Sequence, residues 1–166
     1  MRSALQPESE QEKLNEALID ASKEGNIDLV KGLLEKGAEI NKTSEYGYTA
    51  LHEASYSGQT ETVAMLLEKG AEIHQPNKYG QTALHGACKR GRTETVALLL
   101  DRGANIDQPD KDGNTALHWA SMNGRTETVT LLLDKGAEIN ITDYEGKTAL
   151  HWASRSGKTE TVALLL

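Results

Sequence analysis

The sequence predicts an all-α fold in which short helix pairs stack into a solenoid. The first observation is a tetrapeptide, Thr-Ala-Leu-His, that recurs every 33 residues, at Thr49–His52, Thr82–His85, Thr115–His118 and Thr148–His151. The second is Thr-Glu-Thr-Val, which follows each copy at the same distance, at 60–63, 93–96, 126–129 and 159–162. A fixed period of this length indicates a repeat architecture, in which each unit buries its apolar face only against its neighbours.

Composition restricts the class of protein. The chain has 166 residues, a formal charge of −7 and seven aromatic residues, of which five are Tyr and two are Trp. Cys88 is the only cysteine, so no internal disulfide can form and a reducing compartment is expected. Residues 1–13 lack the apolar run of a signal peptide, and no segment approaches the roughly 20 apolar residues that span a bilayer. We therefore predict a soluble cytoplasmic or nuclear protein with no membrane partner.

The N-terminal region has the features of a capping unit. Residues 1–8 carry no pattern and are predicted to form a flexible tail before a domain at 9–166. Ser9 and Glu12 have the spacing of a capping box, and Gly25 is placed to end the helix that follows. A second short helix is expected around Ile27–Glu35. The first helix is polar, as expected where no neighbouring unit covers it.

Each later unit predicts two short helices and a loop. The Thr of Thr-Ala-Leu-His is a plausible N-cap of the first helix, a Gly interrupts that helix, and Thr-Glu-Thr-Val opens the second. Isolated helices shorter than roughly 12–15 residues are marginal, so neighbouring units must hold these in place. We number the predicted units one to five, with approximate boundaries 9–43, 44–76, 77–109, 110–142 and a truncated 143–166.

These motifs resemble the ankyrin repeat family, which has a 33-residue period and the signature Thr-Pro-Leu-His-x-Ala. The resemblance covers roughly residues 9–166. One departure is systematic, because Ala50, Ala83, Ala116 and Ala149 stand where the family usually has Pro. Pro is favourable but not essential at a first helical position, so the change should cost little. The resemblance implies loops that project to one side and a concave face of turns and inner helices that binds other proteins.

The repeats carry only weak sequence evidence for a metal site or a catalytic site. The four histidines of the repeated motif form a row, but helices pack about 8–10 Å apart and zinc ligands must converge to about 2 Å from one ion. We therefore expect each His to bond its own Thr and the adjacent loop. Asp110 and Asp112 match part of a calcium loop, but its bidentate Glu is missing. Cys88 is expected to pack between helices. We predict no enzymatic activity, no metal and no cofactor.

The predicted protein-binding surface consists of positions that vary between units while the framework repeats. All five tyrosines fall in such positions, and Tyr and Arg are enriched at interface hot spots. Two tryptophans on the inner helices are expected either to pack across those helices or to form the floor of a groove. The full set is Tyr46, Tyr48, Tyr56, Lys78, Tyr79, Gln81, Lys89, Arg90, Lys111, Asn114, Trp119, Met122, Asn123, Tyr144, Trp152 and Arg155. The small Gly86, beside Glu53 and Trp119, predicts a notch.

Charge indicates the class of partner. The variable positions also include Lys147, Glu45, Asp112 and Glu145, so together they carry six cationic and three anionic side chains, whereas the whole chain is acidic. A moderately basic face on an acidic body favours an acidic or phosphorylated protein segment over nucleic acid, whose binders usually have a basic domain.

Two functional hypotheses remain open at this stage. The first is a natural adaptor that binds an intracellular protein. The second is an engineered, consensus-like or excised array, a structural scaffold with no evolved target, because near-identical units fit design as well as duplication. The apolar Leu164–Leu166 segment has no polar cap after it. We expect either that the array continues in a longer protein or that another molecule covers this face, including end-to-end self-association.

Overall fold

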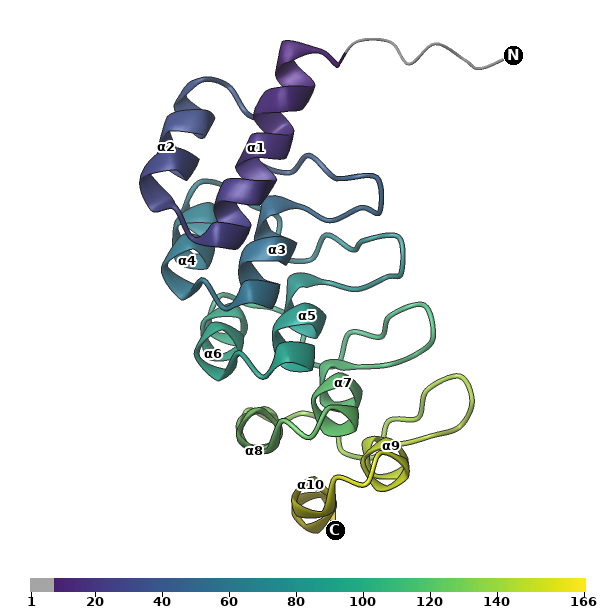
Figure 1. The fold of residues 1–166 in the computed structure, drawn as a ribbon. Helices are drawn as coiled ribbons and strands as arrows, with labels where there is room; N and C mark the ends of the chain where they lie inside the picture. Colours follow the sequence, from purple (N-terminus) through teal and green to yellow (C-terminus); the bar gives the residue numbers. More distant parts are fainter. Residues whose placement is uncertain (1–7) are drawn as a thin grey trace, which may run out of the picture.

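The computed structural model describes residues 8–166, which fold into ten α-helices and no strands (Figure 1). The helices form consecutive pairs: α1 (Glu10–Glu24) with α2 (Ile27–Glu35), α3 (Ala50–Ser57) with α4 (Thr60–Glu68), α5 (Ala83–Arg90) with α6 (Thr93–Asp101), α7 (Ala116–Met122) with α8 (Thr126–Asp134), and α9 (Ala149–Arg155) with α10 (Thr159–Leu165). The predicted all-α stack is confirmed. The predicted flexible tail lies, apart from Glu8, outside the described residues.

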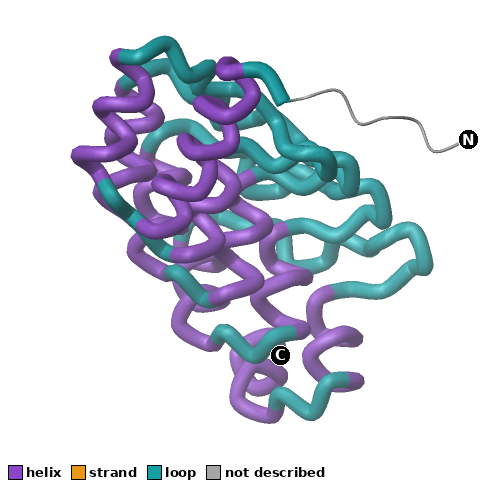
Figure 2. Tube along the Cα trace, turned by 45° about the horizontal axis from the view of Figure 1, so that its top comes forward, coloured by secondary structure: helices purple, strands orange, loops and turns teal. Residues whose placement is uncertain are grey.

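The helix pairs stack so that two rows of helices run the length of the molecule. The odd-numbered helices form an inner row in which each packs on the next, and the even-numbered helices from α4 to α10 form an outer row in the same way. The loops that join successive pairs all project to the side of the inner row (Figures 1 and 2). The inner helices and these loops therefore share one face.

The first helix of each repeat begins with a capping box built from Thr and His. The Thr49 backbone N–H donates to His52 Nδ1 over 3.1 Å, and the His52 backbone N–H donates to Thr49 Oγ1 over 3.3 Å. The same box is present at Thr82, Thr115 and Thr148. In unit one the box uses Ser9 and Glu12, as predicted. Ala50 is the first helical residue of α3, so Ala fills the family's Pro position without loss of the cap.

The inner helices of units one to four end at glycines that the following unit covers. Gly58 has φ +77°, and a Cβ placed on it would lie 2.7 Å from Arg92 Cδ. Arg92 Nε donates to the carbonyl of Tyr56 over 3.2 Å, and Arg125 Nε donates to the carbonyl of Lys89 over 3.1 Å. A cation at a helix C-terminus also interacts favourably with the helix dipole. The sequence predicted these glycine caps, but it did not predict the Arg caps from the next unit.

The outer helices are tied to one another by threonines, which explains the repeated Thr-Glu-Thr-Val. The first Thr of each motif bonds the second Thr of the next unit's motif. The Oγ1–Oγ1 distances are 2.8 Å for Thr60–Thr95, 2.9 Å for Thr93–Thr128 and 3.4 Å for Thr126–Thr161. These hydroxyls are partly or fully buried, so each pair satisfies groups that would otherwise lose water without compensation.

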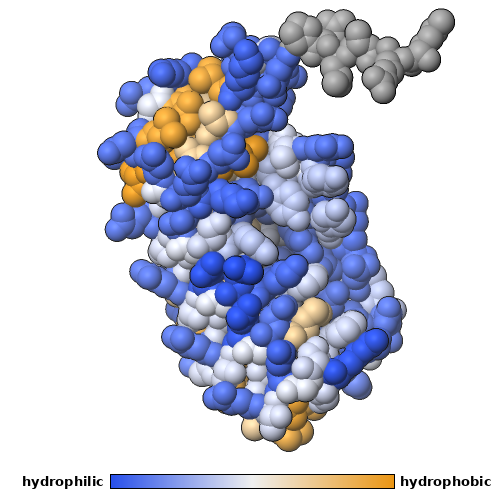
Figure 3. All heavy atoms as spheres, viewed as in Figure 1, coloured by the Kyte–Doolittle hydropathy of each residue, from blue (hydrophilic) through white to orange (hydrophobic). Residues whose placement is uncertain are grey.

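The core is one continuous cluster along the stack. Its largest fully buried apolar side chains are Leu18, Val30, Leu51, Val63, Leu66, Leu84, Val96, Leu99, Leu117, Val129 and Leu132. Cys88 is also fully buried, and burial raises the pKa of its thiol, so it is a packing residue as predicted. On the face shown in Figure 3, apolar side chains gather near the two ends of the stack, and the middle is mostly polar.

Unit five should be the least protected of units two to five in amide hydrogen exchange. It packs on only one neighbour in this chain, so its hydrogen bonds open at a lower free energy. Leu166 is 89% exposed, and His151 is exposed whereas the equivalent histidines are buried. Exchange measured by mass spectrometry on a dilute monomer checks this. Protection of α9 equal to that of α5 would contradict it. Self-association through this end stays a prediction.

Candidate protein-binding surface

The loops that carry the variable positions are joined into a continuous ladder. The Lys78 backbone N–H donates to the Tyr46 carbonyl, and the Lys111 N–H donates to the Tyr79 carbonyl, both over 3.0 Å. The Tyr144 N–H donates to the Asp112 carbonyl in the same way. Gly47 allows this close approach, because its φ is +83° and a Cβ there would lie 2.9 Å from the Lys78 nitrogen. Positions 33 residues apart therefore lie side by side.

The repeated histidines connect each inner helix to the next loop. Nε2 of His52 lies 3.0 Å from the Gln81 carbonyl, Nε2 of His85 lies 2.9 Å from the Gln108 carbonyl, and Nε2 of His118 lies 3.0 Å from the Lys147 carbonyl. Nδ1 accepts the Thr amide, so we assign the proton to Nε2, which donates to the carbonyl. The predicted structural role is confirmed for these three histidines, whereas the bonds of His151 are to Thr148 alone.

Burial determines the protonation state of the central histidines of this row. Desolvation lowers the pKa of His52 and of His85, despite hydrogen bonds that favour the charged form. Their neutral form is therefore the one that the fold selects. Among residues 8–166, no three His, Cys, Asp or Glu side chains are grouped so that they could hold a metal ion.

The two tryptophans anchor the loops of units four and five. Trp119 Nε1 donates to Asp110 Oδ2 over 2.9 Å, and Trp152 Nε1 donates to Asp143 Oδ2 over 2.7 Å. The other oxygen of Asp110 accepts the backbone N–H groups of Asp112 and Asn114. Both carboxylate oxygens of Asp110 are thus occupied within the protein.

Electrostatics support this anchoring role. Desolvation alone would raise the pKa of Asp143. The hydrogen bonds from the Lys147 and Glu145 amides and from Trp152 outweigh desolvation and lower that pKa. The carboxylate is therefore stabilised in its charged form by the loop that it organises.

Sequence analysis missed the Asp–Trp pair. In unit three, Asn77 holds the loop amides with Oδ1, and Gly86 replaces the Trp, so no second acceptor is needed. Asp and Trp occur together in units four and five and at neither position in units two and three. That joint occurrence is the signal that would have revealed the pair.

Asp110→Asn should lower the free energy of unfolding by about 1–3 kcal/mol, because an amide NH₂ would replace the oxygen that accepts the Trp119 indole N–H. Thermal unfolding followed by Trp fluorescence measures this. Asp112→Asn is the matched control, since Asp112 is exposed and contributes only its backbone to the loop ladder. Equal stability of the two variants would contradict the anchoring role.

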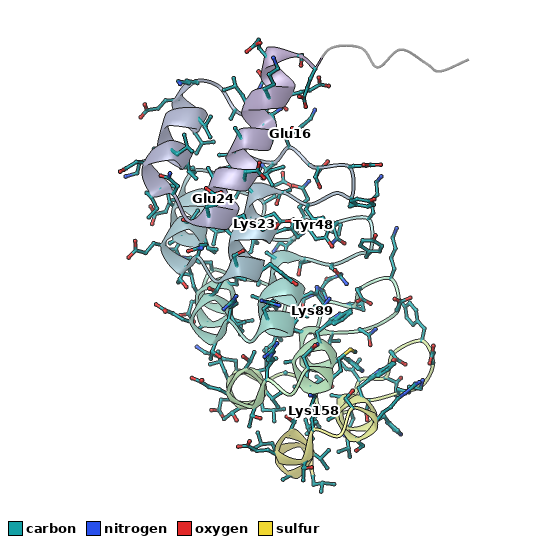
Figure 4. All side chains as sticks on the ribbon, in the orientation of Figure 1. Glu16, Lys23, Glu24, Tyr48, Lys89 and Lys158 are labelled. Carbon is teal, nitrogen blue, oxygen red and sulfur yellow. The ribbon has the colours of Figure 1, made fainter. Side chains whose placement is uncertain are left out.

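Along this surface, Lys and Arg side chains lie over the aromatic rings of Tyr and Trp residues. Arg90 Cζ lies 5.1 Å from the centre of the Tyr56 ring, and Lys89 Nζ lies 5.1 Å from a Trp119 ring centre. Lys147 Nζ and Arg155 Cζ lie 4.8 Å and 5.4 Å from Trp152. Figure 4 shows Lys23, Tyr48 and Lys89 along one side of the stack, contributed by three successive units. Predicted residues from different units thus meet.

Most predicted surface residues are accessible, with one correction. Tyr79 and Tyr144 are 50% and 74% exposed. The exposed set also contains Tyr46, Tyr56, Lys78, Arg90, Lys111 and Arg155, and the half-buried set contains Tyr48, Gln81, Lys89, Trp119, Met122, Asn123 and Trp152. Asn114 is the one predicted surface residue that is buried, at only 6% exposed. Its backbone is held by Asp110 and His85.

A pocket of about 280 Å³ opens at the predicted notch. The rings of Tyr48, Tyr56 and Trp119 line it, and Gly86 on α5 leaves space beside them. Glu53 lies in the same lining. The remaining lining residues are Lys23, His52, Asn77, Gln81, Thr82, His85 and Lys89. The notch is therefore confirmed.

Sequence comparison bears on the family directly. The family profile described as "Ankyrin repeats (3 copies)" matches residues 4–77, 72–143 and 107–166. A comparison with curated proteins found no match. No helix in the described part of the chain is long and apolar enough to cross a membrane. The matched segments span almost the whole chain and agree with its helix pairs, so the protein belongs to the ankyrin repeat family.

Proposed function

We propose that this protein is a non-enzymatic adaptor that binds a protein partner through the face formed by its loops and inner helices. Ankyrin repeats are in general protein–protein interaction modules. The observation that carries the proposal is the location of the residues that differ between units. All five tyrosines lie on the loops or the inner helices, whereas the outer helices repeat the same Thr, Val and Leu pattern.

We further propose that the contacted segment is acidic or phosphorylated. Residues 8–166 contain four ion pairs within 4.0 Å, and neither Lys89 nor Arg90 takes part in any of them. Both cations lie over aromatic rings instead. An anionic group on a partner could bond to them without breaking an internal ion pair. The chain as a whole is acidic, which favours a polypeptide over a nucleic acid.

The proposed setting is the cytoplasm or nucleus. The lone thiol, Cys88, is buried and has a raised pKa, so it is suited to packing and not to redox chemistry or disulfide formation.

Tyr79→Ala should weaken binding of a true partner by at least about 1 kcal/mol and leave thermal stability nearly unchanged, because half of this side chain is exposed at a loop tip. Ligands can be obtained by selection from a display library of natural protein fragments and measured by titration calorimetry. Glu94→Ala on the outer helix α6 is the control. If the outer-helix variant weakens binding and Tyr79→Ala does not, the proposed face is wrong.

The same selection tests the charge of the partner. Fragments enriched by the parent should carry an excess of Asp, Glu or phosphorylated residues. Those enriched by a variant with Lys89→Glu and Arg90→Glu should not, and a Lys69→Glu variant on the outer side should behave like the parent. Enrichment of basic fragments by the parent would contradict the acidic assignment.

A further inference from the structure

We infer that the pocket beside Gly86 receives one aromatic side chain of the partner. This inference rests on the proposed function and adds the residue class that the partner must present. It is carried by three observations: a helical glycine that the fold does not require, three buried polar side chains that already have hydrogen-bond partners, and three aromatic walls.

Gly86 has no structural reason to be glycine. It lies inside helix α5, and it is not among the glycines with positive φ. A Cβ added to it would first meet Tyr56 Cδ2, at 3.6 Å, which is an ordinary van der Waals contact. Glycine is unfavourable inside a helix compared with Ala. The equivalent residues in the other units are Glu53, Trp119 and Trp152. Glycine here therefore keeps a space open at a cost to the helix.

Three polar side chains that line the pocket already use their hydrogen-bonding groups within the protein. His52 uses Nδ1 for Thr49 and Nε2 for the Gln81 carbonyl. His85 uses one nitrogen for Thr82 and the other for the carbonyls of Gln108 and Asn114 in the loop that follows. Asn77 holds two amides with its oxygen and donates to the Gln81 side chain. A polar group that entered beside these three side chains would lose its water without a compensating bond, so an apolar group is favoured there.

Size and wall chemistry select an aromatic side chain. At about 280 Å³ the pocket lies at the lower limit of the roughly 300–1,000 Å³ of small-molecule sites, a size that accommodates a single side chain. The rings of Tyr48, Tyr56 and Trp119 offer edge-to-face or offset contacts to an entering ring. Lys23 and Lys89 outnumber Glu53 among the charged groups of the lining. The aromatic residue therefore suits an acidic segment.

Amino-acid amides with acetylated N-termini, which carry no backbone charge, probe the pocket without a known partner. N-acetyl-phenylalanine amide, N-acetyl-leucine amide and N-acetyl-lysine amide are titrated into the ¹⁵N-labelled protein and followed by NMR. The Trp119 indole N–H and the Gly86 amide report on the pocket, and the Trp152 indole N–H, outside this pocket, is an internal control. The phenylalanine probe should bind about threefold or more tightly than the leucine probe. Equal binding of these two probes, or tighter binding of the lysine probe, would overturn the inference.

Two variants and a matched control complete the test. Gly86→Ala should lower the affinity for the phenylalanine probe about threefold or more, and Gly86→Trp should lower it at least about tenfold. Each substitution places atoms in the space that the ring would occupy. Gly32→Ala adds the same methyl group inside helix α2, where a Cβ meets nothing within 4 Å, and should leave the probe affinity unchanged. Unaltered affinity in the Gly86→Ala variant, shown to be folded by its NMR spectrum, would overturn the inference whatever Gly86→Trp does.

The selected protein fragments separate this inference from the proposed function. If Tyr79→Ala weakens a fragment and Gly86→Ala does not, the binding face stands and the aromatic anchor is wrong. If neither variant weakens any fragment, the proposed function itself fails.

Discussion

Replacing Leu99 with Ala should lower the free energy of unfolding by about 2–5 kcal/mol. Leu99 is fully buried in α6, which packs against both α4 and α8. Truncation removes apolar contacts and leaves a cavity that close-packed neighbours fill only in part. Because units contact only their neighbours, the damage falls on the central interfaces, and the unfolding transition should also broaden. Urea unfolding followed by circular dichroism measures both effects.

Leu29→Ala is the matched control for this loss. Leu29 lies on helix α2 and is 46% exposed, so the same truncation there should cost less than about 1 kcal/mol. If the two variants lose equal stability, Leu99 does not occupy the core position that the fold assigns to it.

Acidification from pH 6.5 to pH 5 should destabilise the protein through its buried histidines. Desolvation lowers the pKa of His52 and His85 in the folded state, whereas both titrate near about 6.5 when unfolded. In this range the unfolded chain binds more protons, so stability rises with pH and is lost as pH falls. Each histidine contributes at most about 1.4 kcal/mol per pH unit, and the two together at most about 2.8. Urea unfolding at several pH values gives the slope.

Substitution identifies the groups responsible for this slope. His85→Gln removes one titrating side chain and should reduce the slope by up to half. His74→Gln is the control, because His74 is an exposed loop residue and should not change the slope. A slope that is the same in the parent and in His85→Gln would show that His85 is not the group that protonates on unfolding.

Repetition made the fold predictable from sequence. The ends of α2, the Ser9–Glu12 box and the Thr–His caps all follow from local spacing rules that four or five units repeat. The interactions between units were harder to predict. The Arg92 cap on the preceding unit and the threonine pairs between outer helices depend on which side chains meet across an interface. Spacing along the chain does not contain that information.

The location of the candidate site could be predicted from the sequence, but the burial and hydrogen bonds of some of its residues could not. Variation between units identified the loops and inner helices, and the small Gly86 indicated the pocket. The burial of Asn114 was not predicted, because its exposure is set by the neighbouring unit and by the bonds of its own backbone. The Asp110–Trp119 bond was also not predicted, because it joins a loop residue to a helix residue nine positions later and depends on how the loop folds back on the helix.

Differential hydrogen exchange with a selected acidic fragment locates the binding face. Exchange is compared with and without the fragment at saturation. We expect slower exchange in the loops around Tyr46 and Tyr79 and in the inner helices α3 and α5, and little change in the outer helices α4 and α6. Slower exchange confined to α4 and α6, with the loops unchanged, would contradict the assignment of the binding face.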